Sequence, residues 1–230
     1  MDIQKYERAA AAVDPSFAHA ARALAAVGEL TANAAINVTA IRDEAGVLSK
    51  HIVDSLYAAR EIASLGARSV LDVGSGGGFP ALPIAAVLPD VAVTALDSTA
   101  KKCRHIESTA AAAGISNVNV ICGRAEEATE LFGGFELVVS RAVASLGALL
   151  ELTSPHCAMG GYVLAMKGER AADEAHEAAR AVEILGLEQC EGVTYALPEG
   201  GDHRTILIYR KVRPTPPGYP RKWGAIRKGI

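Results

Sequence analysis

Apolar residues follow two alternating patterns along most of this chain. Beyond residue 65, short apolar runs typical of buried strands alternate with Ala-rich segments whose apolar residues recur at helical spacing. Strands that alternate with helices pair in parallel, so this pattern predicts a doubly wound α/β sheet of seven strands with helices on its faces. The predicted strands span residues 69–73, 92–97, 118–122, 136–140, 162–167, 188–196 and 205–210, and the predicted helices begin near Pro80, Thr99, Ala125, Ser145 and Ala171.

The two ends of the chain follow other patterns. Residues 1–65 read as helices with a break around residues 37–40, which predicts a helical cap before the sheet. A Pro-Glu-Gly-Gly-Asp segment at 198–202 separates the last two predicted strands, which favours a hairpin. We therefore predict a helical N-terminal cap over 1–65, a sheet-containing domain over 66–212, and a basic Pro-rich tail over 213–230.

A glycine-rich turn gives the strongest chemical signal. An apolar run leads into Gly74, Gly76 and Gly78, and glycine lets backbone N–H groups approach a nucleotide closely because it has no Cβ. Phe79 stands where a dinucleotide-binding motif has its last glycine, and this shorter turn resembles motif I of S-adenosylmethionine-dependent methyltransferases. Asp97 follows roughly 20 residues later, where an acid can accept hydrogen bonds from both ribose hydroxyls. The turn therefore predicts S-adenosylmethionine as the cofactor.

Both features also have plainer explanations. The glycines could form an ordinary loop, and Asp97 could cap the helix expected near Thr99. Strand, turn, helix, second strand and terminal acid occur here in sequence, and that context favours a nucleotide-type site.

Charge is distributed unevenly along the chain. The net charge is only −3, but residues 203–230 contain no Asp or Glu and eight Lys or Arg, which leaves −11 for the remainder. A basic end on an acidic body favours an anionic partner, and the prolines of the tail predict an extended segment. Tyr219 and Trp223 could stack on bases or sugars. A solvated tail without a partner is the alternative.

Cysteine usage and hydropathy indicate an intracellular protein. The four cysteines are widely separated, with no C-x-x-C pair, and are expected to be buried thiols. The sequence has no signal-peptide pattern and no apolar run long enough for a bilayer, so we expect a cytoplasmic location. The histidines lack metal-ligand spacing, and no metal site is predicted.

Nine sequence blocks in order resemble one family, the bacterial 16S rRNA methyltransferase G, also called glucose-inhibited division protein B. The resemblance spans roughly residues 20–230 and implies the class I methyltransferase fold, with an antiparallel last strand. It also implies transfer of a methyl group from S-adenosylmethionine to N7 of a guanine in the decoding-region loop of 16S rRNA. The blocks begin at Asn37, His51, Leu71, Leu96, Arg124, Ser140, Lys167, His203 and Tyr219.

Carried over residue by residue, the resemblance implies a set of site residues. Three positions depart from the family pattern: Ala32 and Ile36 replace aromatic residues, and Ala81 replaces a glycine. None of these departures falls in the glycine turn. The cofactor contacts that the resemblance implies are Gly74, Gly76, Phe79, Asp97, Ala125, Glu126 and Arg141.

The implied reaction needs little from the protein. Guanine N7 has a lone pair and no proton, so alignment with the methyl group can supply catalysis without a general base. We therefore assign no certain catalytic residue. The candidates for a catalytic role are Arg124, Arg141 and Arg204, and the predicted RNA-binding residues are Arg124, Lys167, Arg204, Arg221 and Lys222.

Several of these side chains have alternative roles. Arg141 could pair with Asp72 or Glu126, Arg204 could pair with Asp202 or Glu199, and Lys167 could be solvated. Asp72 itself could hold the glycine turn or approach the methionine amine. His51, Asp54 and Ser55 share one helix face and, with Asn37 and Thr39, could line the substrate entrance or form a local hydrogen-bond network.

Two rival functions remain open from the sequence. One is a class I methyltransferase that acts on another RNA, a small molecule or a protein, and the other is a non-catalytic RNA-binding relative. The basic tail argues against a small molecule or a protein as the substrate, and the intact glycine turn argues against a non-catalytic relative. The expected partner is 16S rRNA or the 30S subunit, with no membrane and no metal, and we expect a monomer.

Overall fold

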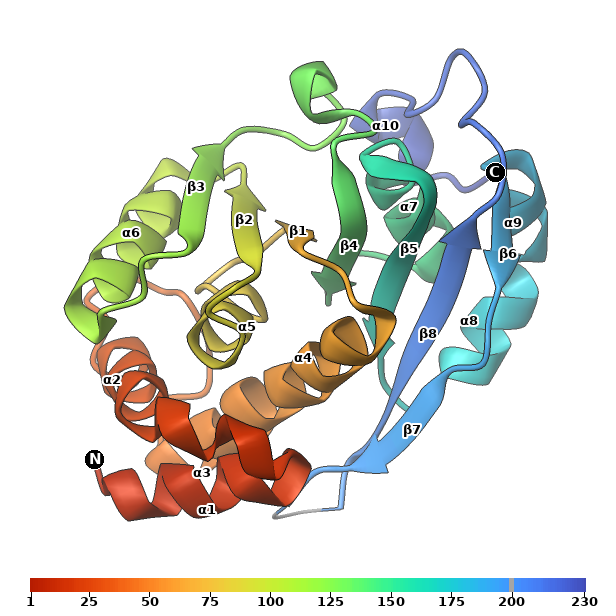
Figure 1. Ribbon diagram of the computed structural model, residues 1–230. Helices are drawn as coiled ribbons and strands as arrows, with labels where there is room; N and C mark the ends of the chain where they lie inside the picture. The colour runs from red at the N-terminus through yellow and green to blue at the C-terminus, as the bar shows by residue number, and fades with distance from the viewer. Residues whose placement is uncertain (199–200) are drawn as a thin grey trace.

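One mixed β-sheet forms the centre of the protein (Figure 1). The computed structural model describes residues 1–198 and 201–230. Within them the sheet has eight strands in the order β3-β2-β1-β4-β5-β8-β6, with β7 paired to β8. Strands β1 to β5 pair in parallel and β8 is antiparallel to β5, as predicted. The strands are β1 (Ser69–Val73), β2 (Ala92–Asp97), β3 (Val118–Cys122), β4 (Phe135–Arg141), β5 (Cys157–Lys167), β6 (Leu187–Gln189), β7 (Val193–Ala196) and β8 (His203–Lys211).

The segment predicted as one strand over 188–196 forms two. Strand β6 pairs with the end of β8 and β7 pairs with its beginning, so the described sheet has one strand more than predicted. Between them, a Cβ on Gly192 would stand 2.6 Å from the carbonyl oxygen of Ile206, an approach that only glycine allows. The predicted hairpin is present, although its turn includes residues 199–200, which lie outside the described part of the chain.

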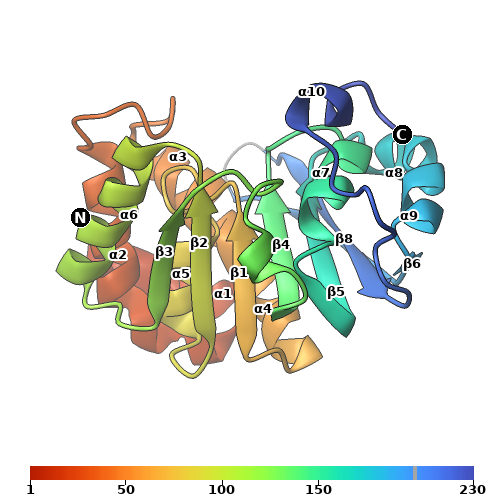
Figure 2. The same ribbon diagram turned by 90° about the horizontal axis from the view of Figure 1, so that it is seen from above.

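Helices cover both faces of the sheet, as predicted (Figure 2). The N-terminal helices share one core with the sheet, in which Tyr6, Leu24, Leu56 and Val70 are fully buried. Helices α7, α8 and α9 pack on the opposite face. The predicted break falls between the second and third helices. The helices on the first face are α1 (Ile3–Val13), α2 (Ala21–Ala32), α3 (Glu44–Val47), α4 (Asp54–Leu65), α5 (Ala81–Val87) and α6 (Ala100–Ala113), and those on the second are α7 (Leu146–Thr153), α8 (Ala171–Glu177) and α9 (Ala179–Ile184).

The helix predicted to begin near Ala125 is absent. The chain turns there and forms only a short 3₁₀ segment at Thr129–Leu131. The carbonyl oxygen of Ala125 accepts a hydrogen bond from Nε2 of His156 at 3.1 Å, and so bonds to a residue far along the chain. This tertiary contact holds the loop after β3 against the second face of the sheet.

The C-terminal tail is not extended throughout, contrary to the prediction from its prolines. A short helix, α10 (Trp223–Ile226), forms near its end. Ile226 is fully buried in the core of the second face. Part of the tail is therefore packed on the body of the protein.

The described residues also bear on the cysteines, membranes and metals. Cys103 and Cys157 are buried, but Cys122 is exposed because it ends the edge strand β3, so the prediction of buried thiols is wrong there. None of the described helices has both the length and the apolar character that a membrane span needs. Within the same residues, no three His, Cys, Asp or Glu side chains are grouped as metal ligands.

Candidate active site

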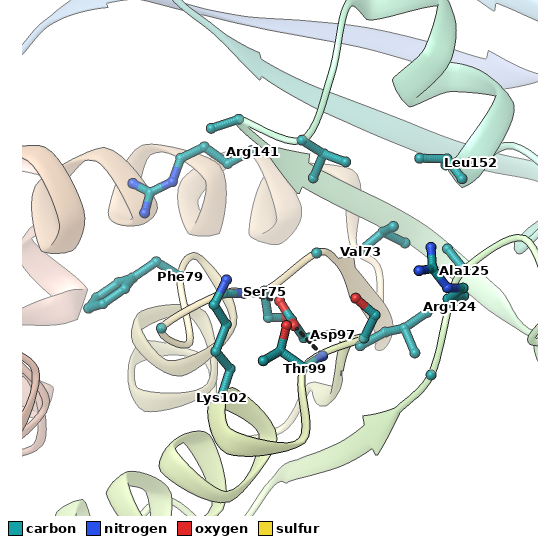
Figure 3. Close-up of a pocket in the computed structure, with 18 of the residues that line it drawn as sticks. Val73, Ser75, Phe79, Asp97, Thr99, Lys102, Arg124, Ala125, Arg141 and Leu152 are labelled. Carbon is teal, nitrogen blue, oxygen red and sulfur yellow. Dashed lines mark hydrogen bonds between the residues drawn. The ribbon is translucent and has the colours of Figure 1, made fainter. Parts of the chain in front are cut away.

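A cavity of about 470 Å³ lies at the carboxyl ends of β1 to β4, where open α/β sheets bind ligands. In Figure 3, Phe79 and Arg141 lie on one side of it, Ala125 and Leu152 on the other, and Asp97 between them. The cavity brings together many of the residues that the sequence singled out. Those that line it are Gly74, Gly76, Phe79, Asp97, Arg124, Ala125, Glu126 and Arg141.

Two backbone N–H groups hold the carboxylate of Asp97, one of them at the helix start that the sequence analysis named as its alternative role. Its Oδ1 accepts a hydrogen bond from the Thr99 backbone N–H at 2.8 Å, at the start of α6 (Figure 3). Its Oδ2 accepts one from the Gly76 N–H at 2.9 Å, in the glycine turn. Each carboxylate oxygen has a further lone pair, so the fixed group can still accept hydrogen bonds from a ligand in the cavity.

Gly74 has a position that only glycine can occupy. Its φ is +76°, in the left-handed region. A Cβ there would also meet Cγ2 of Val143 at 2.5 Å. The N–H groups of Gly74 and Ser75 donate to the carbonyl oxygen of Leu96, at 2.8 and 3.1 Å, which joins the turn to the end of β2. The turn is therefore held in one shape before any ligand binds.

Asp72 holds the glycine turn rather than facing the cavity. It is fully buried, and its Oδ2 accepts a hydrogen bond from the Ala81 N–H at 3.1 Å, at the start of α5. Its Oδ1 is buried without a hydrogen-bond partner among the described residues. Burial raises the pKa of Asp72 to about 7. Of the two roles that the sequence allowed, this placement supports the structural one.

Arg141 crosses from the end of β4 to the N-terminal helices. Its Nη1 donates to Oδ2 of Asp54 at 2.8 Å and to the Lys50 carbonyl oxygen at 3.0 Å. The ion pair predicted for it is thus real, but the partner is Asp54 instead of Asp72 or Glu126. Asp54 is nearly fully buried and accepts a second hydrogen bond from the Tyr195 hydroxyl at 2.7 Å.

His51 extends this network to the cavity. Its Nδ1 lies 3.3 Å from Nη2 of Arg141, and its Nε2 lies 2.7 Å from Oγ1 of Thr39. Because the guanidinium can only donate, Nδ1 is the acceptor and Nε2 carries the proton. The ring stacks on Phe79 with centroids 4.9 Å apart. Burial, with the positive charge of Arg141, lowers the pKa of His51 to about 4, so the ring is neutral at physiological pH.

Four of the five cations predicted to bind RNA do not line the cavity. Lys167 is buried, not solvated, and its Nζ donates to Glu174 at 2.8 Å. Arg204 pairs with Asp202, which was one of its two suggested partners, and its Nε lies 4.0 Å from Oδ1 of Asp54. The other suggested partner, Glu199, lies outside the described residues. Arg221 pairs with buried Glu151, and Lys222 is exposed. Arg124 is the exception, because it lines the cavity with a half-exposed side chain.

Several lining residues were not predicted as cofactor contacts. Lys102 belongs to the first turn of α6, directly after the segment that holds Asp97, and this position was a usable signal. Leu152 and Trp223 come from α7 and α10, far along the chain, and no local pattern places them there.

Comparison with known proteins gives the family. Residues 24–199 match the GidB family, described as rRNA small subunit methyltransferase G. The chain belongs to this methyltransferase G family. It is 41% identical to the ribosomal RNA small subunit methyltransferase G of Deinococcus radiodurans over 195 residues, which cover 84% of this chain and 77% of that protein. With the protein of the same name from Lactobacillus johnsonii it shares 36% identity over 201 residues, 85% of this chain and 84% of that one.

A solved structure supports the fold of this chain. The structure of M. jannaschii TYW2 in complex with AdoMet superposes with a TM-score of 0.55 at 14% identity, over 69% of this chain and 77% of that one. The predicted class I methyltransferase fold is therefore confirmed, and AdoMet, which is S-adenosylmethionine, is the molecule bound in that neighbour.

The cavity of this chain fits that cofactor chemically. A fixed carboxylate, Asp97, is available to ribose hydroxyls, and backbone N–H groups of the glycine turn lie beside it. Apolar Ala125 and Leu152 line the other end, as a purine requires, and Glu126 lies next to them as a hydrogen-bond acceptor.

Proposed function

We propose that this protein transfers a methyl group from S-adenosylmethionine to N7 of a guanine in the decoding-region loop of 16S rRNA. The observation that carries the proposal is the carboxylate of Asp97, which is fixed by Gly76 and Thr99 at the wall of a cavity whose two ends differ in chemistry. Membership of the methyltransferase G family supports the substrate class.

The cofactor is held, in this proposal, by three groups of residues. Asp97 binds the ribose, the backbone of Gly74 and Gly76 lies against the methionine part, and Ala125 with Glu126 contacts the purine. When bound, the cofactor supplies a methyl group activated by its sulfonium. These roles follow the sheet order, because β2 with its terminal Asp97 lies between β1 and β3.

The chain's own contribution is alignment of the guanine. His51, Phe79 and Arg141 occupy the end of the cavity away from Ala125. The neutral ring of His51 has its Nδ1 engaged by Arg141 and its Nε2 proton engaged by Thr39, so it has no free lone pair to act as a base. N7 needs no base, and good alignment alone can supply about 7–11 kcal/mol.

In this proposal the bound RNA also extends over the side of the protein that bears Arg124 and the basic tail. Arg124 is half exposed at the cavity rim, and Lys222 is exposed beside α10. Charge on this side would hold phosphates, a contribution that depends strongly on salt. We also propose that the protein acts in the cytoplasm as a monomer, with the N-terminal residues 1–65 as a cap, 66–212 as the catalytic domain and 213–230 as an RNA-facing tail.

The test is transfer of radiolabelled methyl from S-adenosylmethionine to 16S rRNA and 30S subunits that lack the modification. Nuclease digestion and mass spectrometry then identify the labelled nucleoside. The proposal predicts N7-methylguanosine at one site, and transfer that falls in Arg124→Ala but not in Arg170→Ala, an exposed cation whose partner is Glu177. Label in another nucleoside, in a small molecule or in a protein would contradict the proposed substrate and identify a different one.

A further inference from the structure

Trp223 reaches the cofactor cavity from the C-terminal tail. It is the chain's single tryptophan, and it lines the cavity together with Ala125 and Leu152. Its side chain is half-buried and packs against the core of the second face. A residue of a basic tail is therefore part of the wall of the cofactor site.

Buried contacts hold the tail in this position. Glu151 of α7 is fully buried and accepts three hydrogen bonds from Arg221, through the backbone N–H at 2.8 Å, Nε at 2.9 Å and Nη2 at 2.6 Å. Paired bonds of this kind between arginine and a carboxylate fix orientation as well as distance. Ile226, on the other side of Trp223, is fully buried. Both ends of α10 are thus anchored.

The sheet order shows which end of the cavity Trp223 closes. The loop after β3 lies beyond Asp97 when viewed from the glycine turn, because β2 separates β3 from β1. A nucleoside whose ribose binds Asp97 therefore directs its purine toward Ala125. Figures 1 and 2 both place α10 beside α7, and Figure 2 shows it beyond the carboxyl ends of the strands.

We infer that the Trp223 indole contacts the purine of the cofactor, and that the tail is thereby a part of the cofactor site. This inference rests on the proposed function for the identity of the cofactor. Aromatic side chains are favourable partners for bases because every base has a π-face. Cofactor binding then also stabilises the docked tail, since a ligand that contacts only the docked state favours that state.

The single tryptophan makes the test direct. Tryptophan fluorescence emission of the wild-type protein is recorded while S-adenosylhomocysteine, adenosine or methionine is added. Binding of each compound is measured separately by calorimetry. We expect S-adenosylhomocysteine and adenosine to change the emission at concentrations that match calorimetric binding, and methionine to leave it unchanged. Trp223→Ala should weaken S-adenosylhomocysteine binding roughly five- to tenfold. Trp223→Phe should retain most of the affinity.

A neighbouring position gives the control. Gly224 is exposed in the same helix, and a Cβ there would meet nothing within 4 Å, so Gly224→Ala should leave the affinity unchanged. Calorimetric binding of S-adenosylhomocysteine without a change in emission would overturn the contact and leave the proposed function standing. Absence of calorimetric binding would overturn both. An equal loss of affinity for S-adenosylhomocysteine in Trp223→Ala and Gly224→Ala would show that the helix, and not the indole, is responsible, and would overturn the contact.

Discussion

Arg141 and Asp54 form a buried ion pair at 2.8 Å, although 87 positions separate them in the chain. The side chain of Asp54 is 4% exposed and that of Arg141 is 15% exposed. The pair joins the end of β4 to the start of α4, and Arg141 in turn engages His51 at the cavity. One buried carboxylate therefore positions two side chains of the proposed guanine end.

Asp54→Asn should destabilise the protein and reduce methyl transfer together. The substitution keeps the shape of the side chain but leaves the guanidinium of Arg141 buried without a counter-charge, which costs roughly 3 kcal/mol. Urea unfolding measures the stability loss, and single-turnover transfer measures the effect on alignment. Glu177→Gln removes the partner of an exposed arginine, Arg170, and should change the free energy of unfolding by less than about 1 kcal/mol. Similar losses in the two variants would contradict the role given to burial.

Gly74→Ala should lose stability for two separable reasons. Its φ of +76° costs an alanine about 1–2 kcal/mol, and the new methyl group would also meet Val143. Gly114 has a φ of +71° with nothing within 4 Å of its Cβ position, so Gly114→Ala should show the backbone cost alone. Adding Val143→Ala to Gly74→Ala should recover part of the difference in thermal unfolding. The clash would be disproved by equal melting temperatures for the two single variants.

Asp97→Asn should weaken cofactor binding strongly. The amide group cannot accept at both positions, so hydrogen bonds to the ribose and to the Gly76 or Thr99 N–H compete for one oxygen. Loss of charge-assisted hydrogen bonds predicts roughly 10- to 100-fold weaker calorimetric binding of S-adenosylhomocysteine. Glu127→Gln, an exposed acid beside the cavity loop, is the matched control and should bind as the wild type does. Unchanged affinity in Asp97→Asn would remove this residue from the cofactor site.

Asp72 should make stability depend on pH in a distinctive direction. Its pKa is about 7 in the folded protein and 3.8 in the reference state, so between those values the unfolded chain has lost a proton that the folded protein retains. The contribution of Asp72 is therefore greatest below pH 4 and is lost as pH rises toward 7. Asp72→Asn should gain on the order of 2–4 kcal/mol at pH 8 and little at pH 4. Chemical unfolding at pH 4 and at pH 8 measures this difference in the free energy of unfolding, with Asp90→Asn at an exposed position as the control. A stability gain of the same size at both pH values would exclude this explanation.

Local patterns predicted most of the sheet and part of the lining of the cavity. The glycine turn and Asp97 can each be recognised from a few consecutive residues, because the turn needs glycine and the acid ends an apolar strand. The loop after β3 was predicted as a helix because its sequence permits one. The bond from His156 to the Ala125 carbonyl decided otherwise, and the sequence gives no sign of that contact.

Long-range pairing explains the rest of what the sequence missed. Arg141 was expected to pair with an acid on the same edge of the sheet, but Asp54 of α4 lies closer once the N-terminal helices pack. Arg221 was predicted to bind RNA, and nothing in the sequence indicated its ion pair with the fully buried Glu151. A sequence shows that charges exist, whereas burial of the opposite charge decides which of them remain free.

In the proposed function, the cavity at the carboxyl edge of the sheet binds S-adenosylmethionine with its ribose on Asp97. A crystal structure of the protein with S-adenosylhomocysteine tests this most directly. We expect the ribose hydroxyls on the Asp97 carboxylate, the purine between Ala125 and Trp223, and the amino-acid part beside Gly74. A ligand bound elsewhere, or in this cavity with the purine at the His51 end, would contradict it.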